Sequence, residues 1–278
     1  MRNLTQHNIT QAVIARFDDT PSQRLKEIFT SLVHHLHAFT REVKLTEAEW
    51  FEGIQFLTAT GQMCDDKRQE FILLSDVLGL SMLTVALNHD KPAGCTESTV
   101  FGPFFVEGAP AYEHGGDVAN GAVGDPCEVS GTVRSLNGKV VPDAVIDVWQ
   151  ADADGHYDVE RRELDHAQGR GVLRSGAQGE FHFRTIVAEA YPIPVDGTVG
   201  KLLAATKRHP WRPAHLHFKI EAPGYETLIT HLFRNGDAYL DSDAVFAVRE
   251  SLVADWVKGS DGMHRLKFDF VLNPSTSN

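Results

Sequence analysis

Apolar residues in the first third of the chain recur at the spacing of an α-helix. Seven of them form one stripe: Leu25, Ile28, Phe29, Leu32, Val33, Leu36 and Phe39. Gaps of three and four positions predict an amphipathic helix. Thr20 followed by Pro21 combines a capping hydroxyl with a proline suited to the first helical position, so we expect the helix to begin there.

Three further helices are predicted before residue 92. Thr46 and Glu49 have the spacing of a capping box and predict a helix that reaches about Thr58 and closes near Gly61. Another is expected from about Asp66 to Leu78, stopping at Gly79. A short helix over about 80–87 should end before Pro92.

The pattern changes to an alternation with period two from about residue 127, which predicts β-strands. Asn137-Gly138 follows the first strand and is a strong signal for a hairpin leading into the next. The expected strands cover 129–133, 144–149, 180–185, 214–221, 227–233 and 265–271. The chain is therefore predicted to be mixed and mainly β, with a helical N-terminal domain over 1–98 and a β-sandwich domain over 99–278.

Composition narrows the classes of function and location. The net charge of −12 argues against a nucleic-acid footprint and against a polybasic membrane surface. The first residues lack an apolar signal core, and no apolar run is long enough to span a bilayer. The chain has three widely spaced cysteines, Cys64, Cys95 and Cys127. Because their number is odd and they form no close pair, we expect no disulfide framework and a location in the reducing cytoplasm.

His215 and His217 are the first candidate metal ligands. Side chains two apart on a strand point to the same side, so both imidazoles can hold one metal while Leu216 faces a core. The pair alone does not name the metal, and an incidental pair is the competing interpretation. Tyr157 and Tyr191 lie at strand ends, where sites tend to be built, although either could instead be a core tyrosine.

Three segments in order carry a resemblance to a known family. They are Asp147-Val148-Trp149-Gln150-Ala151-Asp152 with Tyr157, then Tyr191-Pro192-Ile193-Pro194, then His209-Pro210-Trp211-Arg212-Pro213-Ala214-His215-Leu216-His217. In these the chain resembles the intradiol ring-cleaving dioxygenases, which are non-haem Fe(III) enzymes. The resemblance implies one Fe(III) per subunit held by Tyr157, Tyr191, His215 and His217.

The same resemblance implies roles for Tyr191 and Arg212. Tyr191 would leave the iron and act as a base when an aromatic diol or triol binds, and Arg212 would stabilise charge on the ring before O2 attacks it. The family further implies a β-sandwich catalytic domain, a homodimer through the helical domain, and room there for a phospholipid.

Two segments, Val100-Phe101-Gly102-Pro103-Phe104 and Ile193-Pro194-Val195-Asp196-Gly197, resemble those of the hydroxyquinol 1,2-dioxygenase branch. That resemblance implies cleavage of benzene-1,2,4-triol to 3-hydroxy-cis,cis-muconate or its tautomer maleylacetate, with a carboxylate at Asp76 available to the third hydroxyl. The expected substrate-binding residues are Leu73, Asp76, Val100, Phe101, Gly102, Pro103, Phe104, Ile193, Pro194, Val195, Arg212 and His231. Two alternatives remain: cleavage of catechol or a substituted catechol, and a non-catalytic transthyretin-like sandwich that binds a ligand.

Overall fold

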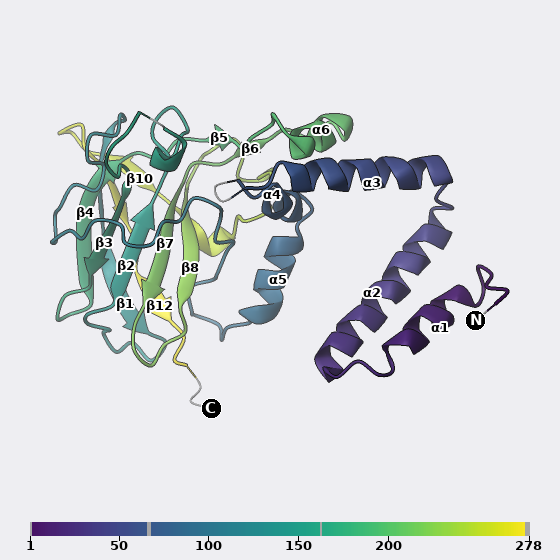
Figure 1. Ribbon diagram of the computed structural model, residues 1–278. Helices are drawn as coiled ribbons and strands as arrows, with labels where there is room; N and C mark the ends of the chain where they lie inside the picture. The colour runs from purple at the N-terminus through teal and green to yellow at the C-terminus, as the bar shows by residue number, and fades with distance from the viewer. Residues whose placement is uncertain (1, 66–67, 162, 276–278) are drawn as a thin grey trace. The chain divides into compact units, whose positions relative to one another are not determined.

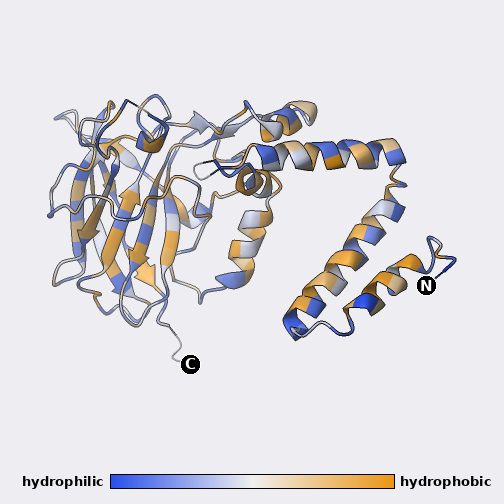
Figure 2. Cartoon of the chain, viewed as in Figure 1, coloured by the Kyte–Doolittle hydropathy of each residue, from blue (hydrophilic) through white to orange (hydrophobic). Residues whose placement is uncertain are grey.

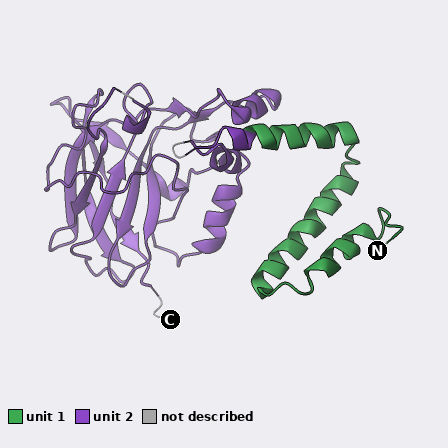
Figure 3. Cartoon of the chain, viewed as in Figure 1, with its two compact units in different colours: residues 1–59 green, residues 60–278 purple. Residues whose placement is uncertain are grey.

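The computed structural model describes residues 2–65, 68–161 and 163–275 (Figure 1). The chain divides into two compact units, residues 1–59 and 60–278, and the boundary falls inside helix α3 (Figure 3).

The first unit is helical. It holds α1 (Ile9–Ile14), the 3-10 turn η1 (Ala15–Phe17), α2 (Gln23–Glu42) and most of α3 (Glu47–Gln62). Helix α2 begins two residues later than predicted, because the Ser22 hydroxyl, and not that of Thr20, accepts the hydrogen bond from the Leu25 amide. The capping box at Thr46 is confirmed, since Glu49 accepts from the Thr46 amide and the Thr46 hydroxyl accepts from the Glu49 amide.

Apolar residues recur along α2 (Figure 2), and the members Leu25, Phe29, Leu32 and Leu36 of the predicted stripe are exposed. No residue of α2 is buried. A helix with such a face normally buries it against another element, so this face is available to a partner.

The described part of the second unit contains three α-helices besides the end of α3. They are α4 (Glu70–Val77), α5 (Leu80–Asn88) and α6 (Thr198–Ala205). Helix α4 is shorter than predicted, and the expected start near Asp66 lies outside the described residues. Gly79 takes φ +72° between α4 and α5, a left-handed conformation that glycine adopts without strain.

Two five-stranded sheets form the sandwich of the second unit, and β5 and β6 pair in a separate two-stranded sheet. One has the order β10-β11-β1-β12 with β4 on the other side of β1, and the other has the order β3-β2-β7-β8-β9. The strands of the first are β1 (Pro126–Ser135), β4 (Glu180–Ile186), β10 (Trp256–Lys258), β11 (His264–Lys267) and β12 (Phe270–Leu272). Those of the second are β2 (Val145–Trp149), β3 (Arg170–Arg174), β7 (His215–Glu221), β8 (Leu228–Arg234) and β9 (Val253–Ala254).

The two sheets pack face to face through aromatic side chains. The ring centroids of Phe218 on β7 and Phe270 on β12 are 4.7 Å apart, and Phe181 on β4 lies 5.8 Å from Phe270. These rings are completely or almost completely buried. The β-sandwich prediction is therefore confirmed, and β7 contributes one of its two faces to the core.

The prediction of a hairpin at Asn137-Gly138 was correct for the turn and wrong for the strand that follows it. A tight turn is present, closed by a bridge between Arg134 and Val140. The next strand, β2, does not pair with β1 but crosses to the other sheet, where it lies between β3 and β7. The residues of the turn close it locally, but β2 finds its partners in the other sheet.

Within the described ranges, no single helix is long and apolar enough to cross a membrane, although α4 and α5, joined at a bend of 78°, together meet the same length and composition test. The three cysteines are free thiols.

Candidate active site

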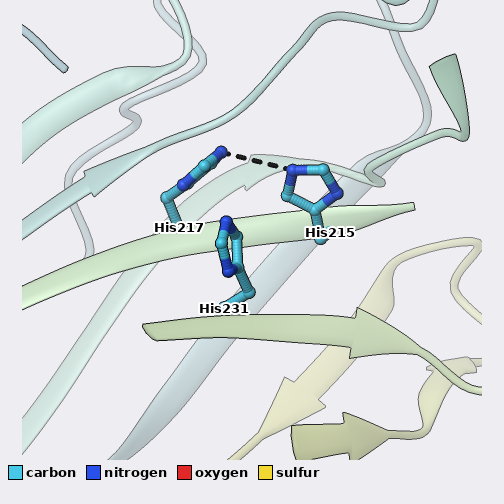
Figure 4. A group of neighbouring side chains, drawn as sticks. All are labelled: His215, His217 and His231. Carbon is cyan, nitrogen blue, oxygen red and sulfur yellow. Dashed lines mark hydrogen bonds between the residues drawn. The ribbon is translucent and has the colours of Figure 1, made fainter. Parts of the chain in front are cut away.

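Strand β7 carries His215 and His217 on the face opposite its core residues Leu216 and Phe218. The Nε2 atoms of the two histidines lie 3.2 Å apart (Figure 4). Trp149 on β2 stacks on the His217 ring at a centroid distance of 4.6 Å, which fixes the plane of that imidazole. The alternation of a β-strand thus brings the predicted pair together.

Two tyrosines reach the same point from separate loops. Tyr157 begins the 3-10 turn η2 (Asp158–Glu160), and its hydroxyl oxygen lies 2.8 Å from His217 Nε2. Tyr191 belongs to β5 (Tyr191–Pro192), and its hydroxyl oxygen lies 3.3 Å from that of Tyr157. All four side chains are buried, so two phenol oxygens and two imidazole nitrogens converge inside the second unit.

A glycine makes room for Tyr191. Gly155 has φ +82°, and a Cβ added to it would lie 2.7 Å from Tyr191 Cβ. Ordinary carbon–carbon contacts are about 3.5–4.0 Å. Gly155 therefore serves both the turn before Tyr157 and the close approach of Tyr191.

Protonation states follow from burial. The pKa values of His215 and His217 lie well below the usual range, mainly because burial disfavours the charged imidazolium. His215 Nδ1 lies 2.7 Å from the Pro213 carbonyl oxygen, which can only accept, so Nδ1 carries the proton and the Nε2 lone pair faces the site. Burial, and then the neighbouring Tyr191, raises the pKa of Tyr157 well above its usual value.

His231 on β8 is a third imidazole at this point. It pairs in register with His217, and nitrogen atoms of His215, His217 and His231 all lie within 4.8 Å of one another (Figure 4). His231 Nδ1 is hydrogen-bonded to the Thr99 hydroxyl, while its Nε2 is buried without a partner among the described residues. Geometry alone therefore permits a three-histidine metal site as well as the two-tyrosine, two-histidine arrangement.

Arg212 lies beside the tyrosine and histidine cluster. It belongs to β6 (Trp211–Arg212) and pairs across the strands with Tyr191. Its Nη1 donates to His215 Nε2 at 3.2 Å and its Nε to Asp243 at 3.2 Å. Nη2 is buried and has no partner in the described part of the chain, so one arm of the guanidinium is available to a ligand.

A pocket of about 720 Å³ opens above this cluster and is lined by Tyr191 and Arg212. Among the predicted substrate-binding residues it is also lined by Leu73, Asp76, Val100, Gly102, Pro103, Phe104, Ile193 and Pro194. The other three predicted residues do not line this pocket. Phe101 packs on Trp149 and Phe105, and Val195 is 53% exposed. His231 lies on β8, opposite His217 of β7.

Asp76 is a buried carboxyl in the pocket wall. Burial raises its pKa, while Ser81 and Arg212 act in the opposite direction. A buried carboxyl of this kind favours a ligand that offers a hydroxyl in return.

Several supporting residues were not predicted. Arg170, on β3, pairs with Asp158 and donates at 2.9 Å to the carbonyl of Phe104, whose ring stacks on Tyr157 at 4.3 Å. Glu70, 1% exposed, accepts from the Val199 amide at the start of α6. Isolated charged residues of this kind carry no spacing signal; only the position of Glu70 ahead of the apolar run 71–74 could have suggested burial.

Two family models match the chain. The model described as "Catechol dioxygenase N terminus" covers residues 22–96, and the one described as "Dioxygenase" covers residues 100–274. The chain belongs to the intradiol ring-cleavage dioxygenase family. The family predicted from the sequence is therefore confirmed, and the non-catalytic sandwich is set aside.

Relatives of this intradiol dioxygenase match it along nearly its whole length. It is 71% identical to a 6-chlorohydroxyquinol 1,2-dioxygenase of Cupriavidus pinatubonensis, over 99% of this chain and 100% of the relative. It is 50% identical to a hydroxyquinol 1,2-dioxygenase of Nocardioides simplex, over 97% and 96% of the two chains. Among solved structures, hydroxyquinol 1,2-dioxygenase from Pseudomonas putida DLL-E4 superposes with a TM-score of 0.91 at 47% identity, covering 97% of this chain and 99% of the other.

Proposed function

We propose that this intradiol dioxygenase cleaves hydroxyquinol, benzene-1,2,4-triol, between its adjacent hydroxyl-bearing carbons. Both atoms of O2 enter the product, 3-hydroxy-cis,cis-muconate, which tautomerises to maleylacetate. The observation that carries the proposal is the convergence of Tyr157, Tyr191, His215 and His217 beneath a pocket whose wall contains Asp76. The relatives named for hydroxyquinol and 6-chlorohydroxyquinol support this substrate class.

The proposed cofactor is one Fe(III) per subunit, held by these two phenols and two imidazoles. Phenolate is a hard anionic oxygen donor of the kind a trivalent cation prefers, and a bound cation can deprotonate its ligand outright. His215 fits a ligand role because its Nδ1 is already engaged by the Pro213 carbonyl. When bound, the ferric ion would withdraw electron density from the aromatic diol and open its ring to O2.

The chain's own residues would bind the substrate and move its proton. Tyr191, ionised where it would hold the metal, would take a proton from a substrate hydroxyl and become a neutral phenol, because it lines the pocket beside Arg212. The free arm of Arg212 would stabilise negative charge on the ring. Asp76 would hydrogen-bond the third hydroxyl, which catechol lacks.

The test is a substrate panel with iron-loaded protein. O2 uptake is measured with hydroxyquinol, 6-chlorohydroxyquinol and catechol, and the products are identified by mass. We expect faster turnover of the triols and addition of both oxygen atoms from 18O2. Faster turnover of catechol would overturn the substrate assignment, and an iron-saturated protein without a tyrosinate-to-iron charge-transfer band in the visible would overturn the ligand assignment.

We further propose a homodimer formed through the helical region, in the cytoplasm. The exposed apolar stripe of α2 supports the dimer, because a face of that length is rarely left in water. A phospholipid is proposed as a further occupant of that region. Light scattering after chromatography, with lipid extraction and mass spectrometry of the same sample, tests the stoichiometry and the lipid; a monomeric protein would contradict the dimer.

A further inference from the structure

We propose that Asp243 is a positioning residue that directs Arg212 toward the substrate and away from Asp76, so that Asp76 stays free for the third hydroxyl of a triol. The inference rests on the proposed function. It concerns a residue that does not line the pocket but contacts Arg212, which does.

Asp243 holds Arg212 by one edge. Its Oδ1 accepts from Arg212 Nε at 3.2 Å, and both side chains are almost fully buried. A buried guanidinium requires a counter-charge, and truncating one partner of such a pair leaves the other charge stranded. Asp243 engages the Nε side, which leaves Nη1 to reach His215 and Nη2 without a partner among the described residues.

The same carboxylate also shapes the pocket wall. Asp243 Oδ1 accepts from the Val245 amide at 3.3 Å and Oδ2 from the Ala247 amide at 2.9 Å. Val245 lines the pocket, and Phe246 between them takes φ +60°. A phenylalanine in the left-handed region persists only where neighbouring contacts impose it, and these two hydrogen bonds span it.

Asp76 is the competing partner for Arg212. It is buried and lines the same pocket as Arg212, and no hydrogen bond joins the two side chains among the described residues. Without the Asp243 charge, Asp76 is the buried carboxylate left to attract the guanidinium. An Arg212–Asp76 pair would remove a hydrogen-bond acceptor from the triol and move the arginine away from the ring.

The kinetic test compares Asp243→Asn with Asp237→Asn. Asp237 is the matched control, because its carboxylate accepts from the Ala214 and Tyr239 amides near the same strand and does not contact Arg212. For Asp243→Asn we expect kcat/KM per bound iron to fall between about tenfold and a hundredfold on catechol. We expect the fall on hydroxyquinol to be larger, with a raised KM, and Asp237→Asn to stay within about twofold on both substrates.

Two outcomes overturn the proposal. One is an Asp243→Asn enzyme whose ratio of hydroxyquinol to catechol kcat/KM equals that of the wild type, since a general loss of folded enzyme lowers both equally. The other is Asp243→Glu restoring neither the rate nor the ratio better than Asp243→Asn. The anaerobic dissociation constant of hydroxyquinol gives a readout without turnover, and it should rise in Asp243→Asn only.

Failure of the proposed function is recognised separately. A wild-type protein that turns over neither substrate refutes the function.

The pairing of Asp243 with Arg212 is tested on iron-free protein by thermal unfolding of Asp243→Asn, Arg212→Met and the double variant. We expect the double variant to be more stable than the sum of the single losses predicts, because neither charge is then stranded; additive losses would show that the two side chains do not act together.

Discussion

Gly155 offers a sharp test of how the Tyr191 position is maintained. Gly155→Ala places a Cβ 2.7 Å from Tyr191 Cβ and does so at φ +82°. The left-handed conformation costs an alanine about 1–2 kcal/mol, and overpacking of a filled core adds about 1–3 kcal/mol. We therefore expect the free energy of unfolding to fall by about 2–5 kcal/mol, summing those two costs.

Gly138→Ala is the matched control for this prediction. Gly138 has φ +81° but nothing within 4 Å of an added Cβ, so it bears the conformational cost alone. Both free energies of unfolding are measured with urea, and the difference between them gives the cost of the contact with Tyr191. Kinetics should separate them further, because displacing a reacting group by about 1 Å can cost about a hundredfold in rate. Equal unfolding free energies, or equal kcat/KM on hydroxyquinol, would refute the account of Gly155.

Four further changes have definite expected outcomes. Tyr157→Phe should abolish most of the visible charge-transfer absorption and lower the slope of log metal affinity against pH by about one, since one fewer phenol proton is displaced. His231→Gln should keep the iron measured by metal analysis, whereas a loss as large as that of His217→Gln would favour the three-histidine site. Arg170→Gln should weaken the stacking of Phe104 on the metal-site tyrosine and raise KM for hydroxyquinol in steady-state assays. Asp76→Asn should stabilise the protein at neutral pH, because the folded state holds the Asp76 proton more tightly than the unfolded state does. The free energy of unfolding of the wild type should therefore fall as the pH rises above about 4. Calorimetry of the variant should not show that fall.

The sequence is most informative where chemistry depends on fixed local spacing. Alternation along a strand is enough to put His215 and His217 on one face, and the helical stripe of the first unit follows from its period. Tyr157 and Tyr191 could be joined to them only through the family resemblance, because they lie 58 and 24 residues before His215 in separate segments. Most residues predicted for the pocket do line it. Leu73 and Asp76 are an example, because their spacing of three places both on one face of α4.

The remainder depends on contacts between distant segments. The Asn137-Gly138 turn predicts a local reversal of the chain, but it does not determine whether β2 pairs with β1 or crosses to the second sheet. Phe101 and Val195 lie in the correct loops, but loop conformation turns them away from the pocket. Buried ion pairs such as Arg170 with Asp158 leave no periodic trace in the sequence, because each partner is a single charge in an irregular segment.

Strand β7 alternates between residues that fill the sandwich core and residues that hold the proposed iron. A substitution at Leu216 or Phe218 that tilts the strand would tilt both imidazoles with it. Few substitutions in β7 would therefore leave the site geometry unchanged. The loops that carry Val100 to Phe104 and Ile193 to Pro194, together with α4, line the pocket without belonging to either sheet. A library aimed at new aromatic substrates should vary those segments and leave β7 untouched.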